Sequence, residues 1–274
     1  KTAVVNIPFG GAKGGISVDY KSLSRAEQER LTKKFAIVLT NDIGENTDIP
    51  APDVGTDQQI MAWILDTYLS TISPHERNRC IHVVTGKPVE SGGSLGRDKA
   101  TGQGVVFNIL EWAKNKNRSL QGATYILQGF GKVGSWSAVI MKQYGARLKA
   151  VEDVSGAIFN PDGIDPEDLR DFVLKHKGEI TEYPGAQSVS HEEFLGTEAD
   201  IFIPAAMENQ ITKETAPLLT VKLVAEGANG PTDPEGDLIL QDKGIDIIPD
   251  ILCNSGGVIV SYFEWLQNKR SEFW

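Results

Sequence analysis

A lysine near the start of the sequence is surrounded by very small residues. It lies in the run Gly10-Gly11-Ala12-Lys13-Gly14-Gly15. Neighbours without bulky side chains let a ligand approach the Lys13 ammonium closely. To act as a base near neutral pH, its pKa must fall from ~10.4 to roughly 7–8, which burial or a neighbouring cation such as Lys1 can cause. The alternative is a lysine that faces phosphate or solvent in a flexible glycine loop.

A carboxylate lies in a segment stiffened by two prolines. The run Asp48-Ile49-Pro50-Ala51-Pro52-Asp53-Val54-Gly55-Thr56 cannot form a regular helix, because each proline fixes φ and lacks an amide donor. A rigid loop orients Asp53 at low entropic cost, which suits proton transfer to a nearby amine. The alternative role for Asp53 is to cap the helix that we predict near Asp57.

A glycine-rich turn in the second half of the chain indicates dinucleotide binding. The apolar run Tyr125-Ile126-Leu127 leads into Gly129-Phe130-Gly131-Lys132-Val133-Gly134, and a predicted helix follows to Tyr144. In this strand–turn–helix setting the three glycines permit the turn, the approach of a pyrophosphate, and close packing of helix on strand. The helix N-terminus adds free amides and partial positive charge. The alternative is a tight turn with no ligand.

The choice of dinucleotide rests on the next strand. The run Leu148-Lys149-Ala150-Val151 ends in Glu152-Asp153, and a carboxylate there accepts hydrogen bonds from the ribose hydroxyls. The same carboxylate repels a 2′-phosphate, so NAD is favoured. Arg147 and Lys149 are close in sequence and leave NADP as the alternative.

The elements around these residues predict an α/β fold in two domains. A capping box at Ser24–Glu27 opens one helix, with Leu31, Phe35, Val38 and Leu39 on one face, and a second helix covers 57–70. Lys1–Ile7 and Ile81–Val84 are predicted strands, and six glycines in 85–104 mark a boundary near residue 95. A helix over 105–116 follows. The strands predicted after it are Thr124–Gln128, Leu148–Glu152, Ile201–Pro204, Leu223–Ala225 and Ile245–Ile248.

This alternation predicts a mostly parallel sheet with helices on both faces. Residues 1–94 would form an α/β substrate domain, and 95–274 a Rossmann-like dinucleotide-binding domain. Residues 157–198 are polar and turn-rich and are predicted to be surface connections.

Composition excludes several classes of protein. The net charge of -10 disfavours nucleic acid as a partner, because an acidic surface repels phosphates. Cys80 and Cys253 are too few for a disulfide framework and lack metal-ligand spacing, so we expect two buried thiols, no metal and a cytoplasmic location. No apolar run approaches the ~20 residues that cross a bilayer. Both ends of the chain look cut.

Taken together, these segments resemble the glutamate dehydrogenases of the Glu/Leu/Phe/Val dehydrogenase family, in order from Lys1 to Trp274. The resemblance is carried by 7–15, 48–56, 61–64, 85–88, 92–94, 100–102, the glycine turn, 204–209, 226–232 and 254–258. It implies reversible, NAD(P)-dependent oxidative deamination of glutamate to 2-oxoglutarate and ammonia, with the active site in a cleft between two domains of a hexamer.

The resemblance also implies a role for each matching residue. Lys13 would activate water and stabilise the carbinolamine, and Asp53 would serve as acid and base toward the amino group. Lys1 would pair with the substrate α-carboxylate. Thr85, Val258 and Ser261 would line the pocket, with Ser261 reaching the γ-carboxylate. The residues implied to contact the cofactor are Thr101, Gly129, Phe130, Gly131, Lys132, Val133, Gly134, Glu152, Asp153, Ala206 and Asn229.

Some features depart from the family pattern. Its members extend beyond both ends of this sequence and carry a second substrate-binding lysine before Lys1. Glu152 stands where many relatives have serine, and Lys132 where many have asparagine. Two alternatives stay open: a leucine, valine or phenylalanine dehydrogenase with the same machinery, and a truncated, non-catalytic dinucleotide-binding homologue.

Overall fold

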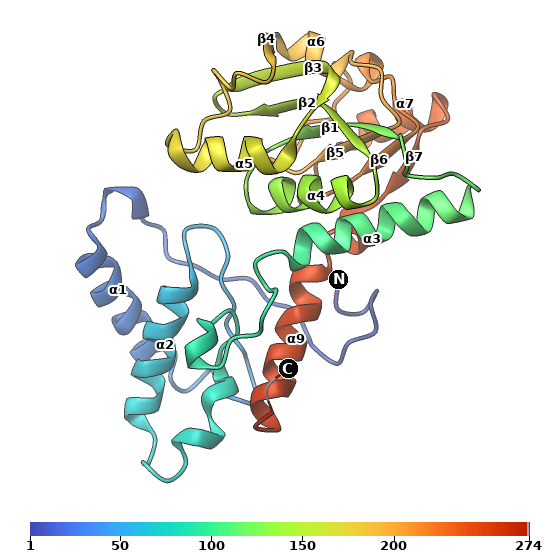
Figure 1. The fold of residues 1–274 in the computed structure, drawn as a ribbon. Coiled ribbons are helices and arrows are strands. Elements are labelled where there is room, and N and C mark those ends of the chain that lie inside the picture. Colours follow the sequence, from blue (N-terminus) through green and yellow to red (C-terminus); the bar gives the residue numbers. More distant parts are fainter. Residues whose placement is uncertain (273) are drawn as a thin grey trace. The chain divides into compact units, whose positions relative to one another are not determined.

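A computed structural model describes residues 1–272 and Trp274 (Figure 1). Contacts within the chain divide it into two compact units. The first, here the sheet unit, comprises Lys1, Ala3–Val5 and Asp98–Gly257; the second, the helical unit, comprises Thr2, Asn6–Arg97 and Val258–Trp274. The change at Arg97/Asp98 lies close to the predicted boundary near residue 95. The predicted assignment of residues 258–274 to the second domain differs from the structure, where they pack with the helical unit.

The sheet unit is built on one seven-stranded sheet with the order β4-β3-β2-β1-β5-β6-β7. Its strands are β1 (Thr124–Gln128), β2 (Arg147–Asp153), β3 (Gly156–Ile164), β4 (Gln187–Val189), β5 (Ile201–Pro204), β6 (Leu223–Ala225) and β7 (Asp246–Ile248). Strands β2, β1, β5, β6 and β7 are parallel, whereas β3 pairs antiparallel with β2 on one side and with β4 on the other. The five predicted strands of this sheet are confirmed, with end differences of one residue.

Helices cover both faces of this sheet, as predicted. Its helices are α3 (Ala100–Asn115), α4 (Lys132–Gln143), α5 (Pro166–Lys175), α6 (His191–Leu195), α7 (Pro234–Asp242), α8 (Asp250–Cys253), the start of α9 (Gly256–Lys269) and the 3-10 turn η5 (Ala216–Leu218). One core contains buried residues of α3, α4 and α5 with one face of the strands. The other contains residues of α6, α7 and η5 with the opposite face, an arrangement visible in Figure 1.

Two predictions for this unit were wrong. Residues 157–198 are not mainly surface connections, since β3, α5, β4 and α6 lie there and Ala157 and Ile158 are buried. Helix α3 begins at Ala100, five residues before the predicted start, and so includes two glycines. A Cβ on Gly102 would lie 2.7 Å from the Ser137 amide nitrogen, so glycine here lets α3 approach α4.

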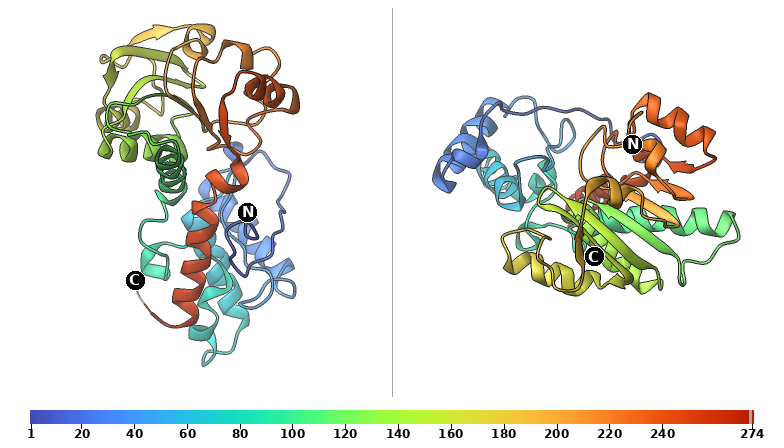
Figure 2. Two further views of the ribbon diagram at one scale, coloured as in Figure 1. Left: turned by 90° about the vertical axis from the view of Figure 1, so that its right-hand side faces the viewer. Right: turned by 90° about the horizontal axis from the view of Figure 1, so that it is seen from above.

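The helical unit is held by two long helices and by most of α9. Its elements are η1 (Tyr20–Ser22), α1 (Arg25–Val38), α2 (Gln58–Thr71), η2 (Arg77–Arg79), η3 (Ile81–Val83), η4 (Val89–Ser91) and α9 from Val258 onward. Both predicted helices are confirmed, including the reciprocal Ser24–Glu27 capping box. Figures 1 and 2 show α9 (red) beside the segment that follows α2.

Three sequence predictions for the first 100 residues were wrong. Residues 1–7 form turns, in which the Val5 amide donates to the Lys1 carbonyl and Asn6 takes a positive φ of 53°. Residues 81–83 form a 3-10 turn, because a short buried apolar run cannot be told from a strand by its pattern. Val38 is exposed at the end of α1, and Ala36 is buried instead.

Candidate active site

The structure brings Lys13 and Asp53, the two predicted catalytic residues, into contact. The Lys13 ammonium donates to Asp53 Oδ2, across 40 residues of sequence. The Lys13 side chain is 82% exposed and that of Asp53 56%, so of the two causes considered for a lowered Lys13 pKa, burial is not supplied by this unit. None of Gly10, Gly11, Gly14 and Gly15 would bring an added Cβ within 4 Å of another group. The space beside the ammonium is therefore open, as a reacting amine requires.

The Asp53 carboxylate is fixed by its own loop. The Val54 amide donates to Asp53 Oδ1 at 2.9 Å, and the Thr56 hydroxyl closes the turn through the Asp53 amide and carbonyl. The helix cap is a different residue, since Asp57 Oδ1 accepts from the Ile60 amide. The alternative role of Asp53 as the cap of α2 is therefore excluded, and its Oδ2 is directed at Lys13.

The Asp53 loop rests on the segment that contains Thr85. The Thr85 amide donates to the Pro50 carbonyl at 2.9 Å, and Gly86 has a φ of 82°. A Cβ on Gly86 would lie 2.4 Å from Pro52 Cδ, so only glycine allows this contact. Thr85 is 1% exposed, and its hydroxyl has no hydrogen-bond partner among the described residues.

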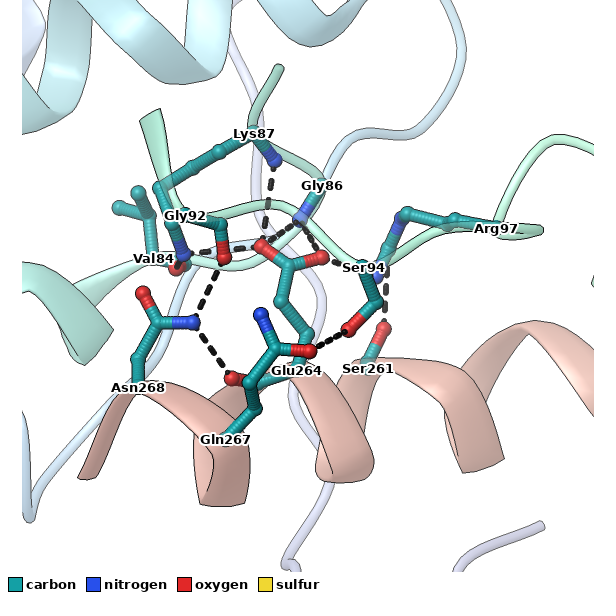
Figure 3. A network of polar contacts seen from close by, with 10 residues as sticks. All are labelled: Val84, Gly86, Lys87, Gly92, Ser94, Arg97, Ser261, Glu264, Gln267 and Asn268. Carbon is teal, nitrogen blue, oxygen red and sulfur yellow. Dashed lines mark hydrogen bonds and ion pairs between the residues drawn. The ribbon is translucent and has the colours of Figure 1, made fainter. Parts of the chain in front are cut away.

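A buried carboxylate on α9 accepts hydrogen bonds from the same segment (Figure 3). Glu264 accepts from the Gly86 and Lys87 amides at 3.0 and 3.3 Å, from Lys87 Nζ at 2.8 Å and from Arg97 Nη1 at 3.2 Å. The Lys87 and Glu264 side chains are wholly buried. Burial lowers the pKa of the Lys87 ammonium, and Glu264 opposes that shift.

The Arg97 guanidinium links this network to a predicted pocket residue. Its Nη2 donates to Ser261 Oγ at 2.9 Å, one helical turn before Glu264. Ser261 is 7% exposed, while Val258, a turn earlier on α9, is partly exposed. The helical unit thus contains the predicted catalytic and pocket residues Lys13, Asp53, Thr85, Val258 and Ser261.

The sheet unit carries the glycine turn at the place its topology predicts. Strand β1 is flanked by β2 on one side and β5 on the other, and the carboxyl ends of parallel strands at such a reversal form ligand-binding crevices. A Cβ on Gly134 would lie 1.8 Å from the Gly129 carbonyl oxygen, and Gly129 has a φ of 90°. An added Cβ on Gly131 would meet nothing within 4 Å. Two glycines are thus required by the fold, whereas Gly131 leaves room for a ligand.

The other predicted cofactor residues lie mostly at the same edge. Glu152 and Asp153 end β2, Ala206 follows β5, and Asn229 follows β6. Phe130 is buried, Lys132 and Val133 open α4, and no side chain caps this helix. Thr101 lies in the first turn of α3. Lys1 belongs to this unit, where its ammonium donates to Asn229 Oδ1.

The carboxylates at the end of β2 have internal partners. Glu152 accepts from Gln128 Nε2 at 2.9 Å and lies 2.7 Å from His191 Nδ1, while Asp153 accepts from the Ser155 amide and hydroxyl. The two basic residues proposed for NADP lie elsewhere. Arg147 pairs with Thr124 at the amino end of β1, about 16 Å along the strand from Glu152 at 3.3 Å per residue. Lys149 donates to the Glu198 carbonyl.

Sequence reasoning missed Lys87, Arg97 and Glu264. A signal was present for Arg97, which lies in the glycine-rich segment 85–104. Glu264 gave none, because a single glutamate in an amphipathic helix is ordinarily a solvated residue. No three His, Cys, Asp or Glu side chains among the described residues are grouped to hold a metal ion.

The whole length of the sequence is similar to known proteins of one family. The Glutamate/Leucine/Phenylalanine/Valine dehydrogenase family matches residues 92–274, two-thirds of the chain, and its dimerisation domain matches residues 1–70. The chain belongs to this family. It is 46% identical over 281 aligned residues to a glutamate dehydrogenase of Thermotoga maritima, an alignment that covers all of this chain and 65% of that protein.

Solved structures of glutamate dehydrogenases are similar to this chain in fold and sequence. A hetero-hexameric glutamate dehydrogenase from Thermus thermophilus, in a leucine-bound form, is 38% identical with a TM-score of 0.92, over 100% of this chain and 64% of that one. The Peptoniphilus asaccharolyticus glutamate dehydrogenase is 39% identical with a TM-score of 0.81, over 98% and 63%. The chain thus spans about two-thirds of the length of these relatives. None of its described helices is long and apolar enough to cross a bilayer.

Proposed function

We propose that this family member catalyses the reversible, NAD(P)-dependent oxidative deamination of glutamate to 2-oxoglutarate and ammonia. The observation that carries the proposal is the pairing of Lys13 with Asp53, an amine among glycines and a carboxylate fixed by its loop. The likeness to a glutamate dehydrogenase over the whole chain supports it.

The paired groups suit the proton transfers of this reaction. The α-amino group must lose a proton as the Cα hydride leaves, which gives an imine, and Asp53 accepts that proton. Water then adds to the imine carbon with Lys13 as the proton acceptor and donor, and ammonia leaves with a proton from Asp53. The nicotinamide of the bound cofactor supplies the hydride acceptor.

The edge of the sheet unit fits a dinucleotide. The space at Gly131 admits a pyrophosphate against the start of α4, where amides and the helix dipole favour an anion. Two carboxylates at the end of β2 oppose a 2′-phosphate, and Arg147 and Lys149 are directed elsewhere. These features support NAD as the preferred cofactor, with NADP as the alternative.

The network at α9 favours an acidic substrate. Arg97, whose side chain is 14% exposed and whose Nη2 donates to Ser261, is the positive charge of this cluster that a ligand can reach, whereas the Lys87 side chain is wholly buried on Glu264. A substrate carboxylate near Ser261 would pair with the Arg97 guanidinium, because a buried charge needs a partner. The hydrocarbon side chain of leucine, valine or phenylalanine would not. The substrate is therefore proposed to be glutamate.

Steady-state assays with glutamate and leucine, each with NAD and NADP, test the proposal. We expect kcat/KM for glutamate with NAD to exceed that for leucine by at least about 100-fold, the difference made by losing the charged hydrogen bonds between a substrate carboxylate and Arg97. A preference for leucine would move the protein to the other branch of the family. Absence of turnover with every amino acid would favour a non-catalytic dinucleotide-binding protein.

We also propose that the protein is a homo-oligomer. The dimerisation domain matches residues 1–70, and the Thermus thermophilus relative is described as hetero-hexameric. We expect sedimentation velocity to give a mass at least twice the 29.8 kDa of this chain. A single species of monomer mass at micromolar concentration would contradict this.

The cytoplasm stays the proposed compartment, because both cysteines are free, buried thiols.

A further inference from the structure

The Glu264 carboxylate is the point at which two parts of the site are joined. It accepts hydrogen bonds from one segment through the Gly86 and Lys87 amides and from another through Arg97 (Figure 3). Gly86 packs on Pro52, beside Asp53, and Arg97 donates to Ser261. Glu264 therefore lies between the group proposed to handle the amine and the group proposed to receive the distal carboxylate.

We propose that Glu264 is a positioning residue that fixes Arg97 and Ser261 relative to the Asp53 loop and thereby sets the affinity for the dicarboxylate substrate. The inference rests on the proposed function. Glu264 is wholly buried and therefore acts on the substrate only through its partners.

The two carboxylate oxygens have distinct partners. Oε1 accepts from the Lys87 amide and ammonium, Oε2 accepts from Arg97 Nη1, and the Gly86 amide lies 3.0 Å from both. Only a group with two acceptor oxygens can satisfy both sets. A glutamine has one acceptor and one NH₂ donor, so in either orientation its NH₂ faces Arg97 or the Lys87 ammonium.

Lys87 contributes to the same cluster in a different way. Its ammonium donates to Glu264 Oε1 and to the Val84 carbonyl, but it touches neither Arg97 nor Ser261 in any hydrogen bond among the described residues. Removing that ammonium leaves Glu264 with the Gly86 and Lys87 amides and with Arg97. Lys87→Met, which keeps most of the apolar stem, is therefore a matched control for disturbing the buried pair.

The test compares Glu264→Gln, Lys87→Met and the double variant with wild type in the direction of 2-oxoglutarate amination. We expect Glu264→Gln to raise KM for 2-oxoglutarate at least about tenfold, which corresponds to ~1.4 kcal/mol. KM for NADH should stay within about twofold, because the glycine turn proposed to bind the cofactor belongs to the sheet unit, whereas Glu264 belongs to the helical unit. Lys87→Met should lower Tm yet leave KM for 2-oxoglutarate within threefold of wild type.

Glu264→Gln alone leaves the buried Lys87 ammonium without its carboxylate and could fail to fold, and the double variant avoids this imbalance of buried charge. It removes one buried cation and one buried anion together, so the net charge of the cluster is unchanged, while Arg97 and the Gly86 and Lys87 amides are left with one neutral amide oxygen in place of a carboxylate. Its KM for 2-oxoglutarate should match that of Glu264→Gln. If Glu264→Gln and Lys87→Met raise KM equally, the role of Glu264 is structural and the proposal is overturned.

Hydrogen exchange separates this inference from the proposed function. Peptides that cover residues 84–92 should exchange faster in Glu264→Gln than in Lys87→Met, because the single amide oxygen of glutamine cannot accept from the Gly86 amide, the Lys87 amide and Arg97 as two carboxylate oxygens do. If wild-type protein converts no 2-oxoglutarate, the proposed function fails, while 2-oxoglutarate binding by calorimetry and the exchange result still decide whether Glu264 positions an anion-binding group. Equal exchange and equal binding in both variants would contradict it.

Discussion

Lys13→Ala is expected to lower kcat for glutamate oxidation by about 10²–10⁴-fold, the range for loss of a general acid or base. The fold should be unaffected, because the Lys13–Asp53 pair is exposed and such pairs contribute only about 0–1 kcal/mol. Cofactor binding should also be unchanged, since the glycine turn belongs to the sheet unit. Steady-state kinetics, thermal melting and NADH titration would measure the three quantities.

Matched variants make this prediction specific. Asp53→Asn is nearly isosteric, keeps an acceptor for the Val54 amide and should lose kcat to a similar degree. Lys34→Ala removes an exposed lysine of the same unit, on α1, and should behave as wild type. Turnover that survives Lys13→Ala would remove the proposed mechanism, whatever the substrate.

The second large effect concerns two glycines three residues apart. Gly134→Ala is expected to destabilise the sheet unit by about 3 kcal/mol or more, at the upper end of the cost of overpacking. The new Cβ would lie 1.8 Å from the Gly129 carbonyl oxygen, a backbone atom that cannot rotate away. Gly131→Ala adds the same methyl group where no atom lies within 4 Å and φ is −75°.

Gly131→Ala should therefore change stability by less than about 1 kcal/mol, as for an ordinary helix-cap substitution. It should nonetheless weaken NADH binding at least tenfold, because the methyl group occupies the space that we assign to the pyrophosphate. Denaturant unfolding and isothermal titration calorimetry would measure the two effects. Unchanged NADH affinity in Gly131→Ala would show that the dinucleotide binds elsewhere.

Local sequence patterns predicted the parts of the fold that local physics determines. The β1 strand and its glycine turn were predictable, because a buried apolar run followed by glycines at fixed spacing has few other solutions. The Ser24 capping box was likewise local. Strands β3 and β4 were missed, because the turn-forming residues at 160–163 interrupt the apolar pattern of β3 and because β4 has only three residues.

In the candidate site, Lys13 and Asp53 could be predicted from the sequence, whereas Glu264 and Lys87 could not. Lys13 and Asp53 stood out because each has neighbours that are unusual for its type, and the structure places them in contact. Glu264 and Lys87 interact across 177 residues, so their pairing follows from tertiary packing alone. The assignment of α9 to the helical unit could not be foreseen for the same reason.

The helical unit is discontinuous in sequence, and this fixes the order in which the two units can be completed during synthesis. Once Gly257 has left the ribosome, every residue of the sheet unit is available, and domains commonly fold as units while the chain is being made. The unit that holds Lys13 and Asp53 must wait for Glu264 and its neighbours on α9. Residues 6–97 are thus translated before the strands of the sheet unit but completed as a unit only after them, and until then Lys87 and Arg97 lack the Glu264 carboxylate that accepts hydrogen bonds from both in the folded protein.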